Sequence, residues 1–241
     1  MQLVLYGTLI FLTALLGGVL PLYHRFKSEG ALKLFVSLGA GLLLGMAAGH
    51  MIPEASHLVP STFGIAFLGG FLLLFVLERF VMVHACEESG CHYHTVGMAA
   101  FAGLGVHGVI EGMALASSLA ATALGPIVLV AILAHKVPCG VALTSLLRLS
   151  KKSTKQILIF VTGIALSGPL GIVLAQIIVA ESHTDAIAGN LLSFSAGTFF
   201  YIAACDLLPE LHHAHKDRNT RLLVFFLGIG LSLLGGYLVG H

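Results

Sequence analysis

The chain has 241 residues, of which 57% are hydrophobic and only 10% are charged, and its mean hydropathy is +0.99. A soluble domain of this length does not need so much apolar surface, which excludes an ordinary soluble enzyme or binding module. The formal net charge of +1 gives no electrostatic reason to expect nucleic-acid binding. We therefore expect an all-α integral membrane protein with a single transmembrane domain over residues 1–241.

Eight apolar stretches follow one another along the chain. A helix needs about 20 apolar residues to cross a bilayer, and these stretches use up nearly the whole sequence. The first lacks a basic n-region and a cleavage site, so we expect a retained helix and not a signal peptide. The expected spans are 2–22, 32–53, 62–83, 96–118, 126–147, 156–180, 187–210 and 221–240.

The basic residues indicate the orientation of these spans. Lys and Arg gather between the first and second, fifth and sixth, and seventh and eighth spans, whereas the loops near 55–61, 119–125 and 181–186 have none. The positive-inside rule then places both termini outside the cytoplasm, in a multi-pass protein of the plasma or inner membrane. Lys136 alone lies deep inside a span, the fifth.

Two early segments carry residues that can bind metal ions. His50 and Glu54 lie at the outer end of the second span, where they could attract incoming cations. The cytoplasmic loop before the fourth span has a group of thiols and imidazoles whose spacing matches no closed zinc finger. We expect weak binding of released ions there, with a merely solvated loop as the alternative. These loop candidates are Cys86, Cys91, His92 and His94.

The fourth and fifth spans contain copies of one motif. His107 opens an eleven-residue segment that recurs 28 residues later at His135, and six of the eleven positions are identical. In each copy a second metal-type side chain follows the histidine at i+4, on the same helix face. These are Glu111 in the first copy and Cys139 in the second. The two helices could therefore bring four ligands to one point, as a transition metal requires.

A second repeat relates the second and seventh spans. Residues 40–54 and 196–210 match at six of fifteen positions, and both segments end in Pro-Glu. The second and seventh spans run in opposite directions, and so do the fourth and fifth. We therefore expect inverted repeats, in which spans one to three correspond to spans six to eight and the fourth span corresponds to the fifth. Inverted repeats around a midplane site are common in secondary transporters. Asp206 and Glu210, near the inner end of the seventh span, are candidates to receive a departing ion.

Together these motifs resemble the ZIP (Zrt/Irt-like) family of divalent metal transporters over essentially the full length. The resemblance rests on His-x-x-x-Glu-Gly at His107, His-x-x-Pro-x-Gly at His135, and the segment from Ala196 to Glu210. It implies uptake of Zn²⁺ or a related ion toward the cytoplasm, through a site between the fourth and fifth helices. It also implies alternating access, with one group of helices moving against another.

The sequence also departs from the family pattern beside this site. Many family members hold two metals. The Asn that often follows the histidine of the fourth span is Gly108 in this sequence, and the Asn or Asp at the corresponding position of the fifth span is Lys136. Where the family usually has Glu in the fifth span, this sequence has Cys139. Where the family has Glu before the proline of the sixth span, this sequence has Gly168. We hypothesise that the Lys136 ammonium takes the place of the second cation, because it would repel a divalent ion at low dielectric.

The sequence thus predicts a transporter with one metal site and no resident cofactor. A set of two His, one Glu and one Cys suits Zn²⁺ and Cd²⁺ better than Mn²⁺ or Mg²⁺, because thiolate is a soft ligand, while Fe²⁺ stays open. The expected partners are the metal ion and the bilayer, and a homodimer stays open. Two other functions are alternatives: an intramembrane zinc-dependent hydrolase, and a metal sensor without ion flux.

Overall fold

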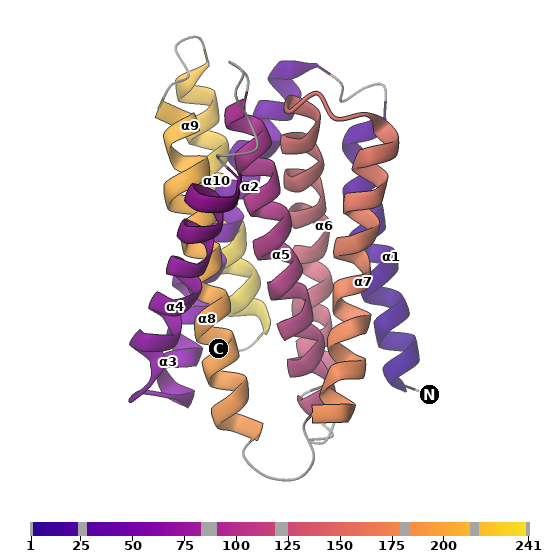
Figure 1. Cartoon of the computed structure of the whole chain (residues 1–241), viewed down its shortest axis with the longest axis vertical. Coiled ribbons are helices and arrows are strands. Elements are labelled where there is room, and N and C mark those ends of the chain that lie inside the picture. Colours follow the sequence, from indigo (N-terminus) through magenta and orange to yellow (C-terminus); the bar gives the residue numbers. More distant parts are fainter. Residues whose placement is uncertain are drawn as a thin grey trace.

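A computed structural model describes residues 2–23, 28–82, 91–118, 125–178, 184–212 and 217–239. Within these ranges the regular structure is entirely helical, and the long helices stand side by side (Figure 1). Three of the helical runs contain a short π-helical segment. In chain order the elements are α1 (Gln2–Val19), η1 (Leu20–Leu22), α2 (Glu29–Met46), η3 (Ala47–Met51), α3 (Ile52–Leu58), α4 (Phe63–Val76), η4 (Leu77–Met82), α5 (Cys91–Ser118), α6 (Gly125–Leu149), α7 (Thr154–Ile178), α8 (Thr184–Tyr201), η6 (Ile202–Leu207), α9 (Leu208–His212) and α10 (Arg218–Val239).

The helices have the length and surface of membrane spans. Six of the described helical runs are long and apolar enough to cross a bilayer. Large apolar side chains point away from the bundle, including Ile65, Ile177 and Leu223, each at least two-thirds exposed. Such a surface is stable in contact with lipid and not with water. The predicted all-α, multi-pass membrane fold is confirmed, whereas the crossing of all eight predicted spans stays a prediction.

The repeat between the second and seventh spans is present in the backbone. In the first copy the Ile52 N–H bonds the Ala47 carbonyl, and in the second the Leu208 N–H bonds the Ala203 carbonyl. These i→i−5 bonds close two π-helical turns at matched positions, 156 residues apart. Each turn directly precedes the proline of the Pro-Glu ending, which has no N–H for the α-helical ladder. The shared proline thus explains the shared distortion.

Glycines fix how the repeated helices pack. A Cβ added to Gly41 would lie 2.0 Å from the Phe225 carbonyl oxygen, and one added to Gly197 would lie 2.0 Å from that of Phe67. The first contact joins α2 to α10 and the second joins α8 to α4. Gly41 and Gly197 are matched positions of the repeat, so these two helix pairs are related by its pseudo-symmetry. Only glycine permits backbones to approach this closely.

The motif-bearing helices follow the same rule. Against α7, a Cβ at Gly112 of α5 would lie 2.1 Å from the Gly168 carbonyl oxygen. Against α1, a Cβ at Gly140 of α6 would lie 3.0 Å from the Ala14 carbonyl oxygen. Gly112 and Gly140 are the matched glycines that follow Glu111 and Cys139. The expected inverted relation of the fourth and fifth spans is therefore visible in their packing.

These contacts divide the helices into two groups. The first bundle is α1, α5, α6 and α7, and the second bundle is α2, α4, α8 and α10 with their short extensions (Figure 1). The bundles meet where α2 packs on α6 and where α5 packs on α8. Side chains face these contacts: Gly39 of α2 faces the Ala142 methyl of α6, and Gly103 of α5 faces the Ile202 side chain of η6, the extension of α8. At the matched glycines the backbones approach each other within a bundle, whereas Gly39 and Gly103 face side chains of the other bundle.

Two glycines of α10, Gly228 and Gly230, differ in how closely another helix approaches them. A Cβ at Gly228 would lie 2.5 Å from the Leu38 carbonyl oxygen, whereas a Cβ at Gly230 would meet nothing within 4 Å. We expect Gly228→Ala to destabilise the protein by about 1–3 kcal/mol, because the backbones must separate. Gly230→Ala is expected to be neutral or stabilising by up to about 1 kcal/mol, since alanine favours a helix. Thermal unfolding in detergent measures both, and equal midpoints for the two variants would contradict the packing account.

Candidate metal centre

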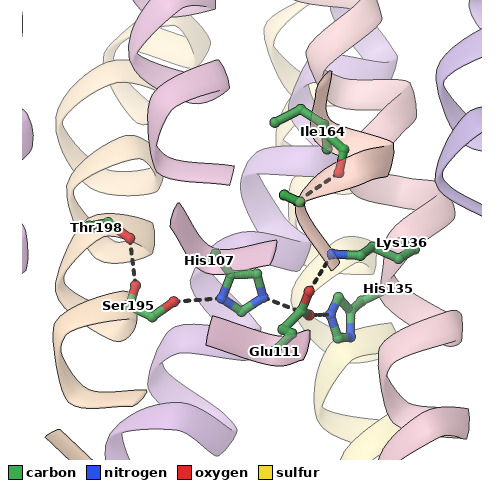
Figure 2. Close-up of polar contacts among 8 residues, drawn as sticks. His107, Glu111, His135, Lys136, Ile164, Ser195 and Thr198 are labelled. Atoms are coloured by element: carbon green, nitrogen blue, oxygen red, sulfur yellow. Dashed lines mark hydrogen bonds and ion pairs between the residues drawn. The ribbon is translucent and has the colours of Figure 1, made fainter. Parts of the chain in front are cut away.

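Helices α5 and α6 bring three of the predicted ligands together (Figure 2). His107 and Glu111 lie one turn apart on α5, and His135 faces them from α6. One ligand atom from each side chain lies within 4.8 Å of the others. His107 and Glu111 are buried, and His135 is half-buried. Two imidazoles and a carboxylate at this spacing can coordinate a single transition-metal ion.

The two oxygens of Glu111 have different neighbours. Oε1 lies 2.7 Å from His107 Nε2 and also contacts His135 Nε2, so both rings present the same nitrogen to one point. Oε2 accepts a hydrogen bond from Lys136 Nζ. A buried carboxylate is costly unless it is paired and hydrogen-bonded. Here one oxygen faces the imidazoles while the other is neutralised by an ammonium, as Figure 2 shows.

The space for Lys136 depends on a missing side chain. A Cβ at Gly108 would lie 1.9 Å from Ser167 Oγ and 3.4 Å from Lys136 Nζ. Ser167 is itself held by donating a hydrogen bond to the Ile164 carbonyl, at 2.7 Å. A side chain at position 108 would therefore collide with α7 and crowd the ammonium. Gly108 and Lys136, which both depart from the family pattern, are thus spatial neighbours.

Cys139 does not join the three clustered ligands. It lies one turn beyond His135 on α6, is 7% exposed, and packs within the apolar core. Among the described residues the metal-type cluster consists of His107, Glu111 and His135. The i+4 spacing places Cys139 on the expected face of the helix, but its thiol is held among apolar side chains. Its role as fourth ligand stays a prediction.

His107 also contacts the second bundle. Its Nδ1 lies 2.5 Å from Ser195 Oγ of α8, and its ring packs at a tilt against Phe199, with centroids 4.0 Å apart. Neither residue was among the candidates from sequence: Ser195 directly precedes the repeat that begins at Ala196, and Phe199 lies inside it but carries no polar group. A serine deep inside a membrane helix was the available signal, since polar side chains there commonly bond neighbouring helices.

The entry and exit candidates lie along the second bundle. His50 falls in η3, where its Nε2 is 3.0 Å from the Ser232 carbonyl oxygen, and Glu54 is half-buried in α3. Asp206 is buried in η6 beside Glu78 of η4. Glu78 was not among the candidates from sequence, although a charged residue inside a span indicates a functional position. The Tyr201 hydroxyl donates a hydrogen bond to Glu78. Glu210 belongs to α9, and its side chain is outside the described residues.

The candidates before the fourth span are only partly described. Cys86 lies outside the described residues, and so do the side chains of Cys91, His92 and His94. The backbone of these last three is helical, because α5 begins at Cys91 and not near residue 96. A helix can continue past its apolar segment, since its backbone hydrogen bonds do not depend on the bilayer. Metal binding by these residues stays a prediction.

Comparison with known proteins gives a consistent result. The sequence profile described as ZIP Zinc transporter matches residues 83–235. Zinc transporter ZIP9 of Xenopus tropicalis is 27% identical, over 93% of this chain and 92% of that protein. Zinc transporter ZIP9-B of Xenopus laevis is 28% identical over 83% and 82%, respectively. Zinc transporter ZIP9 of Macaca fascicularis is 33% identical over 58% of this chain and 66% of its own length.

The pairing of Lys136 with Glu111 can be tested by stability. Lys136→Met leaves a buried carboxylate without its ammonium, which costs about 3–5 kcal/mol for a pair of this kind. We expect the metal-free variant to unfold at a much lower temperature, and Zn²⁺ to raise that temperature more than in the wild type. Lys33→Met is the control, because Lys33 pairs with the exposed Glu29, where a surface ion pair contributes at most about 1 kcal/mol. Equal unfolding temperatures for all three proteins would refute the buried pair.

Proposed function

The chain belongs to the ZIP zinc transporter family, and on this premise we propose that it carries Zn²⁺ toward the cytoplasm through one site between α5 and α6. The observation that carries this proposal is the convergence of three ligand atoms. His107 Nε2, His135 Nε2 and Glu111 Oε1 meet at one buried point within the membrane-spanning helices. Zn²⁺ is the metal named for the family and for its curated relatives, and it accepts this donor set.

One ion per site is the second part of the proposal. Glu111 has two oxygens, and the ammonium of Lys136 already holds the one that faces away from the histidines. A second divalent ion on that oxygen would lie next to a positive charge in a low-dielectric environment, where repulsion is strong. Gly108 offers no oxygen ligand there. The Lys136 charge then remains in place as the transported ion comes and goes.

Cys139 is proposed as the fourth ligand once the ion is bound. It needs a change of rotamer or a small shift of α6, since its thiol is packed in the apolar core. A thiolate would favour Zn²⁺ and Cd²⁺ over harder ions such as Mn²⁺ and Mg²⁺, and Fe²⁺ stays open. Because the thiol must lose its proton to coordinate, metal binding would strengthen as the pH rises.

The transport path follows from the two bundles. We propose that the first bundle, which holds the ligands, moves against the second bundle across their side-chain interface. With both termini outside the cytoplasm, His50 and Glu54 lie toward the entrance, while Asp206 and Glu78 lie toward the exit. The carboxyl pair would hold the ion transiently as it leaves. The alternatives of a hydrolase and of a sensor without flux find no support in the family or in the described site.

Zinc flux into proteoliposomes tests the function. Glu111→Gln keeps the shape of the side chain but removes the charge that faces both histidines, so uptake is expected to fall by at least about 10-fold, as for loss of a metal ligand or its support. Glu29→Gln is the matched control, because Glu29 lies exposed at the start of α2 and its variant should transport normally. Wild-type flux in Glu111→Gln would contradict the site, and absence of flux in the wild type would contradict the function.

Ion selectivity tests the role of Cys139. We expect Cys139→Glu to shift preference toward Mn²⁺, because a carboxylate is a harder ligand than a thiolate. Cys139→Ser separates the loss of sulfur from the gain of charge and should weaken Zn²⁺ binding without favouring Mn²⁺. The measurement is the ratio of Zn²⁺ to Mn²⁺ uptake by each variant. An unchanged ratio in Cys139→Glu would show that the thiol is only a core side chain.

A further inference from the structure

The metal-site histidine on α5 is held by a residue from the opposite bundle. His107 Nδ1 and Ser195 Oγ are 2.5 Å apart, and both side chains are buried, at 4% and 0% exposure. Ser195 lies on α8, in the second bundle, whereas the clustered ligands all lie on α5 and α6, in the first. This hydrogen bond therefore crosses the interface across which the proposed movement takes place (Figure 2).

The chemistry of imidazole gives this bond a purpose. A neutral histidine binds a metal through one ring nitrogen and carries its proton on the other. His107 presents Nε2 to Glu111 Oε1 and to the convergence point, so Nδ1 must hold the proton when Zn²⁺ is bound. Ser195 Oγ is in place to accept that hydrogen bond. Such partners fix the tautomer and ring orientation of metal-binding histidines.

The inverted repeat shows that the arrangement is one-sided. The position of helix α2 that matches Ser195 is Gly39, 156 residues earlier in the chain. Glycine has no side chain to offer His135, the repeat partner of His107. Gly39 instead faces the Ala142 methyl, where an added Cβ would lie only 2.4 Å away. Within the described part of the chain, the second bundle thus hydrogen-bonds His107, whereas His135 contacts Glu111 and His107 of α5.

We propose that Ser195 is a positioning residue that α8 supplies to the metal site, so that the site reaches full Zn²⁺ affinity only while the bundles are docked as in this structure. The inference rests on the proposed function. Movement of α5 along α8 withdraws the acceptor from Nδ1, which leaves its N–H buried without a partner. The site then binds Zn²⁺ more weakly, and the same movement that exposes the ion also favours its release.

Zinc affinity of purified variants tests the proposal, with competition against a fluorescent zinc indicator as the readout. Ser195→Ala is expected to weaken binding by about 10–100-fold, the usual effect of removing such a partner, and Ser195→Thr, which keeps the hydroxyl, should restore most of it. Ser193→Ala is the matched control: Ser193 is equally buried on α8 but donates to the Phe63 carbonyl within its own bundle. Its affinity should equal that of the wild type.

Transport kinetics separate positioning from a general structural effect. Ser195→Ala should raise KM in zinc uptake and leave the maximal rate unchanged or higher, because the bond is absent anyway when the ion leaves. Equal affinities for Ser195→Ala and Ser193→Ala, or a lower maximal rate with unchanged KM, would overturn the proposal. If Ser195→Ala does not fold, ¹⁵N-histidine NMR of the zinc-loaded wild type decides, since zinc on Nδ1 of His107 would overturn it. Wild-type protein that neither binds nor transports Zn²⁺ would instead refute the proposed function.

Discussion

A single buried carboxylate organises the centre of this protein. Glu111 lies inside a membrane-spanning helix, where an isolated negative charge would be very costly, and its two oxygens are satisfied by two imidazoles and one ammonium. In the proposed mechanism the Lys136 ammonium stays on Oε2, while the imidazoles exchange their contact with Oε1 for the bound cation. On this proposal the charge of Glu111 would stay compensated before, during and after the passage of an ion.

The frame around Glu111 is nearly symmetric, while the site is not. Glycines at matched positions, such as Gly112 and Gly140, hold α5 and α6 against their partners in equivalent ways. Onto this duplicated frame the chain places different side chains: Glu111 opposite Cys139, Gly108 opposite Lys136, and Ser195 opposite Gly39. The pseudo-symmetry relates helices within each bundle, α5 to α6 in the first and α2 to α8 in the second. The asymmetric side chains are the basis for proposing one ion site.

Much of this could be predicted from sequence, because the relevant signals are local. Apolar length gives the helices, and the repeated His-x-x-x motif gives the faces that carry His107, Glu111 and His135. Contacts between distant segments were harder to foresee. Ser195 and Glu78 reach their partners only through helix packing, and the same packing holds the Cys139 thiol in the apolar core although its spacing suits a ligand. The early start of α5 was missed because polar residues at a helix end carry no hydropathy signal.

In the proposed site one ion binds between α5 and α6, with the Lys136 ammonium in place of a second. A zinc-loaded crystal structure, with anomalous scattering measured at the zinc absorption edge, tests this most directly, because it locates and counts the ions. We expect one zinc peak between the two helices, coordinated by His107, Glu111 and His135, with Lys136 still on the second oxygen of Glu111. Two zinc peaks between α5 and α6, or zinc bound only elsewhere, would contradict it.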